Sequence, residues 1–331
     1  MRSTRNDAST RTADTTRTAD STLTADPSFA GGCPVAHGAR MDRDPDRSAT
    51  TDAPGDAATL DHGYFGPGSI SWRIFSDPSS KLGGVAALLL QSLNPMMMRL
   101  FDGTSGYASD AEGRAERTGR YIDTTVFGDR AHADAAGEAV RRLHAASTWT
   151  DPRTGEELRA DTQEWLAWTH NAIVYGVLRA ADAFGPMLTV AEQDRFVLEQ
   201  HEAARIVGIT DAALLPDSRA ELDRYIDDNQ IWMALTLPAA ELSRELRAPA
   251  LRGNPVKVWA AVNIQDGILS LLPEWARLLF GIDGRPMNLR AAARVTRRLT
   301  AAARAGRSSN ELISEVTARV QTHPYRKVRR R

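Results

Sequence analysis

Helical periodicity is the feature that most constrains the fold of this chain. From about residue 79 onward, apolar residues recur every three or four positions, and proline or glycine separates one such stretch from the next. Alternation of the kind found in strands, bounded by hairpin turns, does not occur. The pattern predicts an all-α fold, a single helical domain of about ten helices. The expected ranges are 79–100, 111–126, 132–147, 162–184, 190–207, 217–234, 238–246, 255–271, 273–281, 286–305 and 308–321.

Composition narrows the class of protein. With 331 residues, 42% of them hydrophobic and 25% charged, the chain can bury a sizeable core. The net charge of −1 gives no reason to expect nucleic acid or anionic lipid as the main partner. Cys33 is the only cysteine, which rules out an intrachain disulfide and a cysteine-rich zinc or iron–sulfur site.

The first 60 residues differ from the rest of the chain. They contain one aromatic residue, Phe29, and repeat the pattern Thr-x-Thr-Ala-Asp. Such a segment cannot bury enough apolar surface to offset the entropy of ordering it. We therefore expect a disordered leader over 1–60, the helical domain over 61–321 and a basic tail over 322–331. Neither a signal peptide nor a transmembrane segment is expected, which points to the cytoplasm.

One predicted helix carries an unusual polar face. Arg114, Arg117, Thr118 and Tyr121 share a face at helical spacing. A core helix would normally place aliphatic side chains there. Two arginines and a threonine indicate a pocket with an anionic or oxygen-bearing occupant; the alternative is a solvated arginine face.

Two histidines lie on apolar stripes. His144 follows Ala136, Val140 and Leu143 at helical spacing, and His170 lies among Leu166, Ile173 and Val174. A neutral imidazole on a rigid helix can bind a metal, whereas the alternative is a core histidine whose nitrogens are hydrogen-bonded.

A pair of glycines interrupts the most apolar helix. Gly83 and Gly84 lie within the stretch 79–100, which is apolar on nearly every side and is therefore expected to be buried. Glycine inside a helix lowers its stability. We therefore expect something flat or bulky to approach closely at this point. Pro95 should end or kink the helix.

An ordered series of segments resembles the oxygenase family named after the mycophenolic acid oxygenase MpaB, whose relatives include the rubber-cleaving latex-clearing proteins. The resemblance covers roughly residues 62–290. It implies an all-helical, globin-like packing around one haem b with a histidine as the iron ligand. The segments are Gly66-Pro-Gly68-Ser-Ile-Ser-Trp72-Arg, Gly83-Gly84-Val-Ala-Ala-Leu-Leu-Leu-Gln91-Ser-Leu-Asn94-Pro95, Arg114-x-x-Arg117-Thr118, Phe127-Gly128, Leu143-His144-Ala145, Trp168-Thr-His170 and Pro273-Glu-Trp275-Ala-Arg277.

Carried onto this chain, the resemblance assigns roles to five residues. His144 becomes the iron ligand. Arg114, Arg117 and Thr118 become pocket residues that hold a propionate or the bound oxygen species, and His170 is the second candidate for the ligand or for a pocket donor. Many relatives have His-Pro where this chain has Asn94-Pro95, so a role of that histidine does not transfer.

Sequence motifs of other enzyme classes are absent from the chain. The chain has no Gly-x-Ser-x-Gly elbow, phosphate-binding Gly-Lys-[Ser/Thr] loop or His-Glu-x-x-His motif, and no histidine follows a glutamate at the spacing of di-iron proteins. The first hypothesis is a haem-dependent oxygenase that uses O₂ or peroxide on a hydrophobic small molecule or polymer, such as a terpenoid, a polyisoprenoid or a secondary metabolite. The alternative is a non-catalytic helical protein that binds an apolar ligand, with or without haem.

Overall fold

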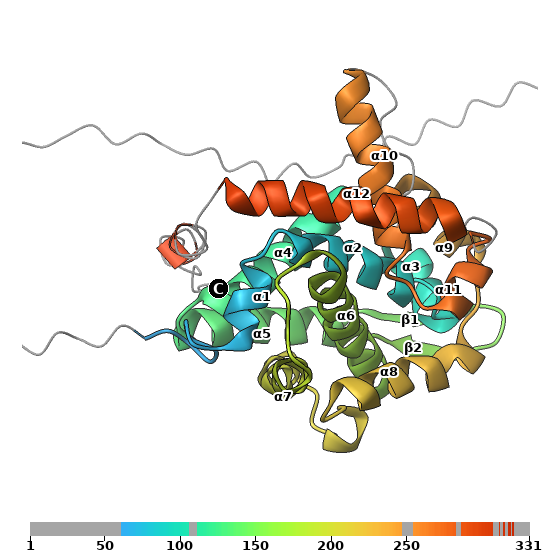
Figure 1. Cartoon of the computed structure of the whole chain (residues 1–331). Helices are drawn as coiled ribbons and strands as arrows, with labels where there is room; N and C mark the ends of the chain where they lie inside the picture. The colour runs from blue at the N-terminus through green and yellow to red at the C-terminus, as the bar shows by residue number, and fades with distance from the viewer. Residues whose placement is uncertain are drawn as a thin grey trace, which may run out of the picture. The chain divides into compact units, whose positions relative to one another are not determined.

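Twelve α-helices and one small hairpin make up the described part of the chain (Figure 1). The computed structural model describes residues 61–105, 111–246, 254–282 and 286–306, together with 311, 314, 317, 318 and 320. The predicted leader 1–60 and tail 322–331 lie outside these residues. Every described element falls within one compact unit. The all-α prediction is confirmed.

The helices follow one another with short connections. Their bounds are α1 Ile70–Phe75, α2 Ser79–Gln91, α3 Pro95–Ser105, α4 Ala111–Phe127, α5 Arg130–Ala146, α6 Gln163–Phe184, α7 Val190–Val207, α8 Arg219–Asp228, α9 Leu237–Leu246, α10 Pro255–Leu269, α11 Glu274–Leu279 and α12 Pro286–Ala305. Two 3₁₀ turns, η2 Ala212–Leu214 and η3 Asn229–Trp232, lie on either side of α8.

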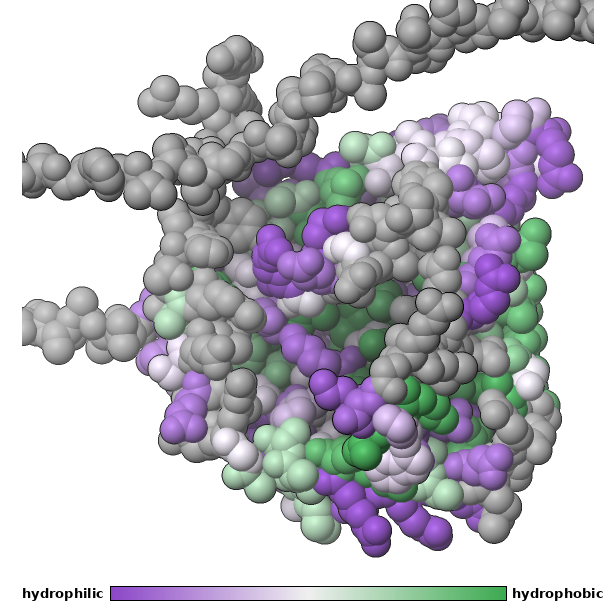
Figure 2. All heavy atoms as spheres, turned by 90° about the horizontal axis from the view of Figure 1, so that it is seen from above, coloured by the Kyte–Doolittle hydropathy of each residue, from purple (hydrophilic) through white to green (hydrophobic). Residues whose placement is uncertain are grey.

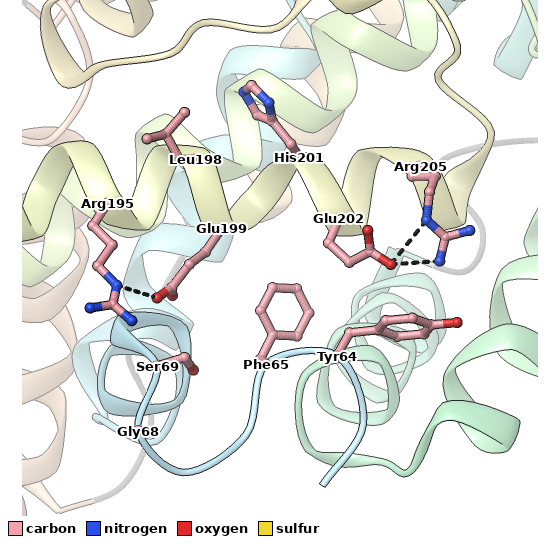
Figure 3. Close-up of a pocket in the computed structure, with 10 residues that line it drawn as sticks. All are labelled: Tyr64, Phe65, Gly68, Ser69, Arg195, Leu198, Glu199, His201, Glu202 and Arg205. Atoms are coloured by element: carbon pink, nitrogen blue, oxygen red, sulfur yellow. Dashed lines mark hydrogen bonds and ion pairs between the residues drawn. The ribbon is translucent and has the colours of Figure 1, made fainter. Parts of the chain in front are cut away.

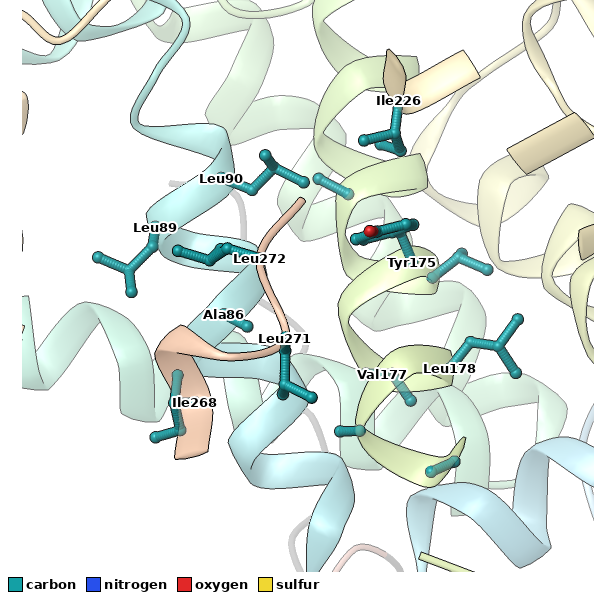
Figure 4. Close-up of a cluster of buried hydrophobic side chains, with 14 of the residues drawn as sticks. Ala86, Leu89, Leu90, Tyr175, Val177, Leu178, Ile226, Ile268, Leu271 and Leu272 are labelled. Carbon is teal, nitrogen blue, oxygen red and sulfur yellow. The ribbon is translucent and has the colours of Figure 1, made fainter. Parts of the chain in front are cut away.

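Helices α2 and α6 form the centre of the molecule. Gly83 of α2 meets Gly176 of α6 so closely that a Cβ on Gly83 would lie 2.5 Å from the carbonyl oxygen of Gly176. Aliphatic side chains of both helices continue this contact into the main core, where Ile226 of α8 and the residues at the end of α10 join them (Figure 4). For Gly83, the expected close approach is therefore that of a neighbouring helix.

Proline and asparagine divide the stretch predicted as one helix over 79–100. α2 ends at Gln91, and Pro95 is the first residue of α3. The side chain of Asn94 accepts hydrogen bonds from the backbone nitrogens of Met96 and Met97, both at 3.1 Å. Asn94 thus caps α3, and Pro95 occupies the position where a missing N–H costs nothing.

The prediction that the chain contains no strands was wrong for one segment. Residues Thr148–Thr150 (β1) and Glu157–Arg159 (β2) pair antiparallel in the part of the chain expected to be a simple turn. The half-buried Trp149 lies opposite the buried Leu158, with polar neighbours on both strands. Three residues a strand are too few for alternation to be recognised in the sequence.

Helix α12 is fastened to the core at its C-terminal end. Arg304 forms an ion pair with the buried Asp77 and donates a hydrogen bond to the carbonyl oxygen of Phe184, at 2.8 Å. Thr300 donates to the same carbonyl, at 3.1 Å. These contacts hold α12 against both the start of α2 and the end of α6.

A capping box is present at the start of α7, and it gives a pH-dependent prediction. The backbone N–H of Thr189 and the guanidinium of Arg73, each 2.8 Å from the Glu192 carboxylate, lower the pKa of Glu192 to about 2. This carboxylate therefore stabilises the fold fully above its ordinary pKa of 4.5, and the contribution is lost as the pH falls from 4.5 toward 2. Glu192→Gln should lower the free energy of unfolding at pH 7, and urea titrations should show the difference from the wild type shrinking below pH 4.5. A difference that grows toward acid pH would contradict the assignment.

Candidate functional site

An apolar cavity of about 110 Å³ lies between α2, α4 and α6, with a contribution from α1. Its walls are mostly aliphatic, and four polar side chains reach it: Ser80, Lys81, Gln91 and Thr118. The remaining lining residues are Phe75, Gly84, Val85, Leu88, Gly119, Ile122, Ile173 and Val177. One face of the molecule is also hollowed, with hydrophobic residues on the floor of the hollow and hydrophilic residues around it (Figure 2).

Two glycines line the cavity, one from α2 and one from α4. A Cβ placed on Gly84 or on Gly119 would have no atom within 4 Å. Gly83, the immediate neighbour of Gly84, would instead clash with α6. Packing between helices therefore requires only the first glycine of the pair. Gly84 and Gly119 leave space that a side chain would otherwise occupy. At Gly84, therefore, no other part of the described chain makes the predicted close approach, and the glycine borders open volume instead.

An ion pair joins the two helices that line the cavity. Lys81 of α2 lies 3.0 Å from a carboxylate oxygen of Asp123 on α4. The side chain of Lys81 is 63% exposed and that of Asp123 only 11%, so the lysine stands at the outer rim and the aspartate inside. The pairing offsets the cost of placing a carboxylate in a largely dry environment.

The predicted polar face of α4 divides into two parts. Thr118 and Ile122 line the cavity, and Thr125 further along the helix is buried. Arg117 is exposed and does not belong to the cavity lining. Arg114 belongs to α4, but its side chain lies outside the described residues. Of the three predicted pocket residues, Arg114, Arg117 and Thr118, the structure brings Thr118 to the cavity.

His144 lies in the last turn of α5 and does not line the cavity. Its Nδ1 is buried and has no hydrogen-bond partner among the described residues. Burial lowers the pKa of His144, and the charge of Asp161 acts weakly in the opposite direction. The imidazole is therefore neutral at pH 7, which is the form that binds a metal.

The apolar stripe predicted around His144 was partly wrong. Leu143 is 62% exposed, whereas Ala133, Ala136 and Gly137 are the buried residues of α5. Gly137 is pressed against Ile206 of α7, where a Cβ would lie 2.5 Å from the Ile206 side chain. This contact turns α5 so that His144, not Leu143, faces inward.

His170 is the more strongly perturbed of the two candidate histidines. Burial, and to a lesser extent the charge of His201, lowers the pKa of His170 to about 3. It lies in the middle of α6 but does not line the cavity. His170 is therefore a neutral imidazole at physiological pH, available as a hydrogen-bonding group or a ligand but not as a cation.

A wider hollow of about 710 Å³ lies between the loop 64–69 and α7, and it contains none of the predicted site residues (Figure 3). Its charged groups serve the fold. Glu199 accepts hydrogen bonds from the backbone N–H groups of Ile70 and Ser71 at the start of α1, at 3.2 and 2.8 Å. Arg205 is paired with Glu202, and His201 is hydrogen-bonded to the carbonyl of Pro216. We therefore regard this hollow as the junction between α1 and α7.

The cavity residues that sequence reasoning missed include Lys81, Gln91 and Gly119. The only signal was the glycine pair in α2, because Lys81 and Gln91 lie on the same helix at positions that look solvated or neutral in sequence. Gln91 donates a hydrogen bond to the carbonyl of Thr169 at 2.9 Å, which ties the end of α2 to α6 beside His170.

Among the described residues, no group of three or more His, Cys, Asp or Glu side chains lies close enough together to hold a metal ion. None of the helices in this part of the chain has both the length and the apolar character needed to cross a bilayer.

The fold and the site define a helical protein with an apolar cavity between packed helices. Two neutral imidazoles belong to it, that of His170 on the central helix α6 and that of His144 on α5. The family described as "ER-bound oxygenase mpaB/B'/Rubber oxygenase, catalytic domain" matches residues 72–305. The chain belongs to this family, as its sequence segments indicated. The family is one of oxygenase catalytic domains. Comparisons with curated proteins and with solved structures give no match.

Proposed function

We propose that this protein is a haem-b-dependent oxygenase with His144 as the iron ligand and a hydrophobic organic molecule as the substrate. The observation that carries the proposal is the orphaned Nδ1 of His144, a buried nitrogen without a partner on an imidazole that is neutral at pH 7. Leaving such an atom unpaired costs free energy in the protein alone. A haem iron needs only one or two axial ligands from the protein, so a single imidazole suffices.

The order of α4 and α5 supports a site shared by Thr118 and His144. The two helices pack together and are joined by Gly128 and Asp129 alone. Helices with so short a connection usually run antiparallel. Thr118 lies in the first half of α4 and His144 in the last turn of α5, so both lie toward the ends remote from the connection.

The size and lining of the cavity agree with a haem of which only one edge enters the cavity. At about 110 Å³ it is smaller than a pocket that encloses a whole ligand, typically about 300 Å³ or more. The open space at Gly84 and Gly119 admits one flat edge.

Haem, when bound, supplies the activation of O₂ or peroxide. The chain's own residues supply the surroundings. The hydroxyl of Thr118 would supply a hydrogen-bond donor at the cavity wall, and the aliphatic walls would exclude water and accept an apolar substrate. Arg114 and Arg117 remain candidates for holding an anionic group near the start of α4. Terpenoids, polyisoprenoids and apolar secondary metabolites fit this lining.

The decisive measurement is an absorption spectrum of the full-length protein expressed with a haem precursor, with a pyridine haemochrome assay for stoichiometry. A Soret band and about one haem b per chain are expected. A colourless protein that also fails to take up added haemin would overturn the proposal and favour the non-catalytic binding protein.

The two cavity glycines provide a steric test. Gly84→Leu and Gly119→Leu place a side chain in open space, so each variant should fold and gain helix stability of roughly 0.5 kcal/mol or more. Both should take up haemin less well than the wild type, because the added side chain fills the volume between α2 and α4. Titration with haemin followed at the Soret wavelength measures this. Gly68→Leu, at an exposed position outside the cavity where an added Cβ would also meet no atom within 4 Å, serves as the mutation control for haemin uptake. Unchanged uptake in both cavity variants would place the bound group elsewhere.

A further inference from the structure

A row of arginines runs along the outer face of α12. Arg290, Arg294, Arg297 and Arg298 are all exposed and recur at the spacing of a single helical face. The sequence of helix α12 itself contains no aspartate or glutamate. Like charges four residues apart lower helix stability. An anionic partner along this face would remove that repulsion.

The first turns of α10 project beyond α12 and present apolar side chains (Figure 1). Val256 is 70% exposed, Trp259 53% and Val262 37%. Helices of globular proteins normally bury side chains of this kind against a neighbour. The exposed residues therefore form an apolar tip rather than a solvated end.

The apolar tip and the arginine row lie close together. The hydroxyl of Thr296 on α12 donates a hydrogen bond to the carbonyl of Asn263 on α10, at 2.9 Å, and Thr296 also fills the space beside Gly267. Trp259 is one helical turn before Asn263, about 6 Å along the axis. Arg297 directly follows Thr296 in the sequence. Cationic and apolar groups thus meet where α10 crosses α12.

We propose that α10 and α12 form a docking surface for an anionic lipid bilayer. Arginines attract the negatively charged headgroups, while Trp259 and the two valines enter the boundary between headgroups and acyl chains. Nucleic acid would match the arginines but not the exposed valines, whereas a bilayer of anionic lipid matches both. Docking of this kind would bring the oxygenase domain to a source of apolar molecules. The proposal does not depend on haem or on His144.

Sedimentation of the full-length protein with vesicles tests this surface. Vesicles of phosphatidylcholine alone are compared with vesicles that also contain roughly 30% phosphatidylserine, at low and at high salt. Binding should require phosphatidylserine and weaken with salt. One arginine near an anionic membrane contributes about fivefold in affinity, so the triple variant Arg294→Gln, Arg297→Gln, Arg298→Gln should bind roughly a hundredfold more weakly.

A matched control removes the same charge elsewhere. The triple variant Arg130→Gln, Arg142→Gln, Arg224→Gln alters exposed arginines of α5 and α8 and should bind vesicles far better than the α12 variant. Val256→Ser with Trp259→Ser tests the apolar tip and should weaken vesicle binding. The tryptophan fluorescence of the wild type should shift to shorter wavelength on binding, and this shift should be lost in the double variant because it lacks Trp259.

Three results would overturn the proposal. They are equal sedimentation with neutral and anionic vesicles, equal loss of binding in the two triple variants, or binding to an oligonucleotide without binding to vesicles. Haem content, measured on the same samples, reports separately on the proposed oxygenase chemistry.

Discussion

Replacing His144 with alanine should abolish stoichiometric haem binding. The wild-type protein is expected to carry about one haem per chain, and the variant almost none, because the imidazole is the proposed protein bond to iron. The pyridine haemochrome assay and the Soret band measure this loss. Far-ultraviolet circular dichroism should remain unchanged, since His144 lies in the last turn of α5 and its Nδ1 makes no hydrogen bond that the change would break.

His170→Ala is the matched comparison. His170 lies in the middle of the central helix α6 and is neutral at pH 7, so it has the chemistry of a ligand but lies on a different helix. We expect this variant to keep its haem, and we expect added imidazole to restore the Soret band of His144→Ala by entering the vacated space. Retention of haem by His144→Ala together with its loss from His170→Ala would transfer the ligand role to His170.

The second large effect is expected at Gly83. Gly83→Ala would place a methyl group 2.5 Å from the carbonyl oxygen of Gly176 and 2.6 Å from Cα of Val177, and both are backbone atoms of the central helix. Backbone atoms cannot turn aside as a flexible side chain can, so α2 and α6 must separate. Overpacking of this kind costs about 1–3 kcal/mol.

The neighbouring glycine provides a control that differs by one position. Gly84→Ala places its methyl group in open space on the same helix, so the substitution should stabilise the protein by about 0.5–1 kcal/mol through helix propensity alone. Thermal unfolding of the two variants should separate their Tm values by roughly 5–10 °C. Equal Tm values would show that the α2–α6 contact is less close than the structure indicates.

The ends of elements were predictable where local chemistry decides them. Pro95 separates α2 from α3, as expected of a residue without a backbone N–H. The capping box of Thr189 and Glu192 at the start of α7 is likewise a local pattern of two residues three positions apart. The hairpin at Trp149 and Leu158 was missed because its strands are too short to show a period. It forms because α5, α3 and α6 bring its residues together, which no local pattern records.

The candidate site was predictable only in part. Helical spacing placed Thr118 on a face expected to border a pocket, and Thr118 lines the cavity, whereas Arg117 of the same predicted face is exposed. It could not separate Gly83 from Gly84, although one lies in a helix contact and the other in a cavity. Leu143 was expected inside because it is apolar, yet burial depends on which face of α5 meets α7, and Gly137 decides that.

By itself, the sequence determined the class of fold and the order of the main helices, because periodicity, caps and breakers act over a few neighbouring residues. It also determined the family, because an ordered series of segments can be recognised without the three-dimensional structure. The tertiary structure alone decided that Lys81 and Asp123 pair across the cavity, that His144 faces inward, and that the arginines of α12 lie beside the apolar tip of α10. These arrangements join residues that are far apart in sequence. They depend on the rotation of each helix against its neighbours, which is fixed by close packing across the whole domain.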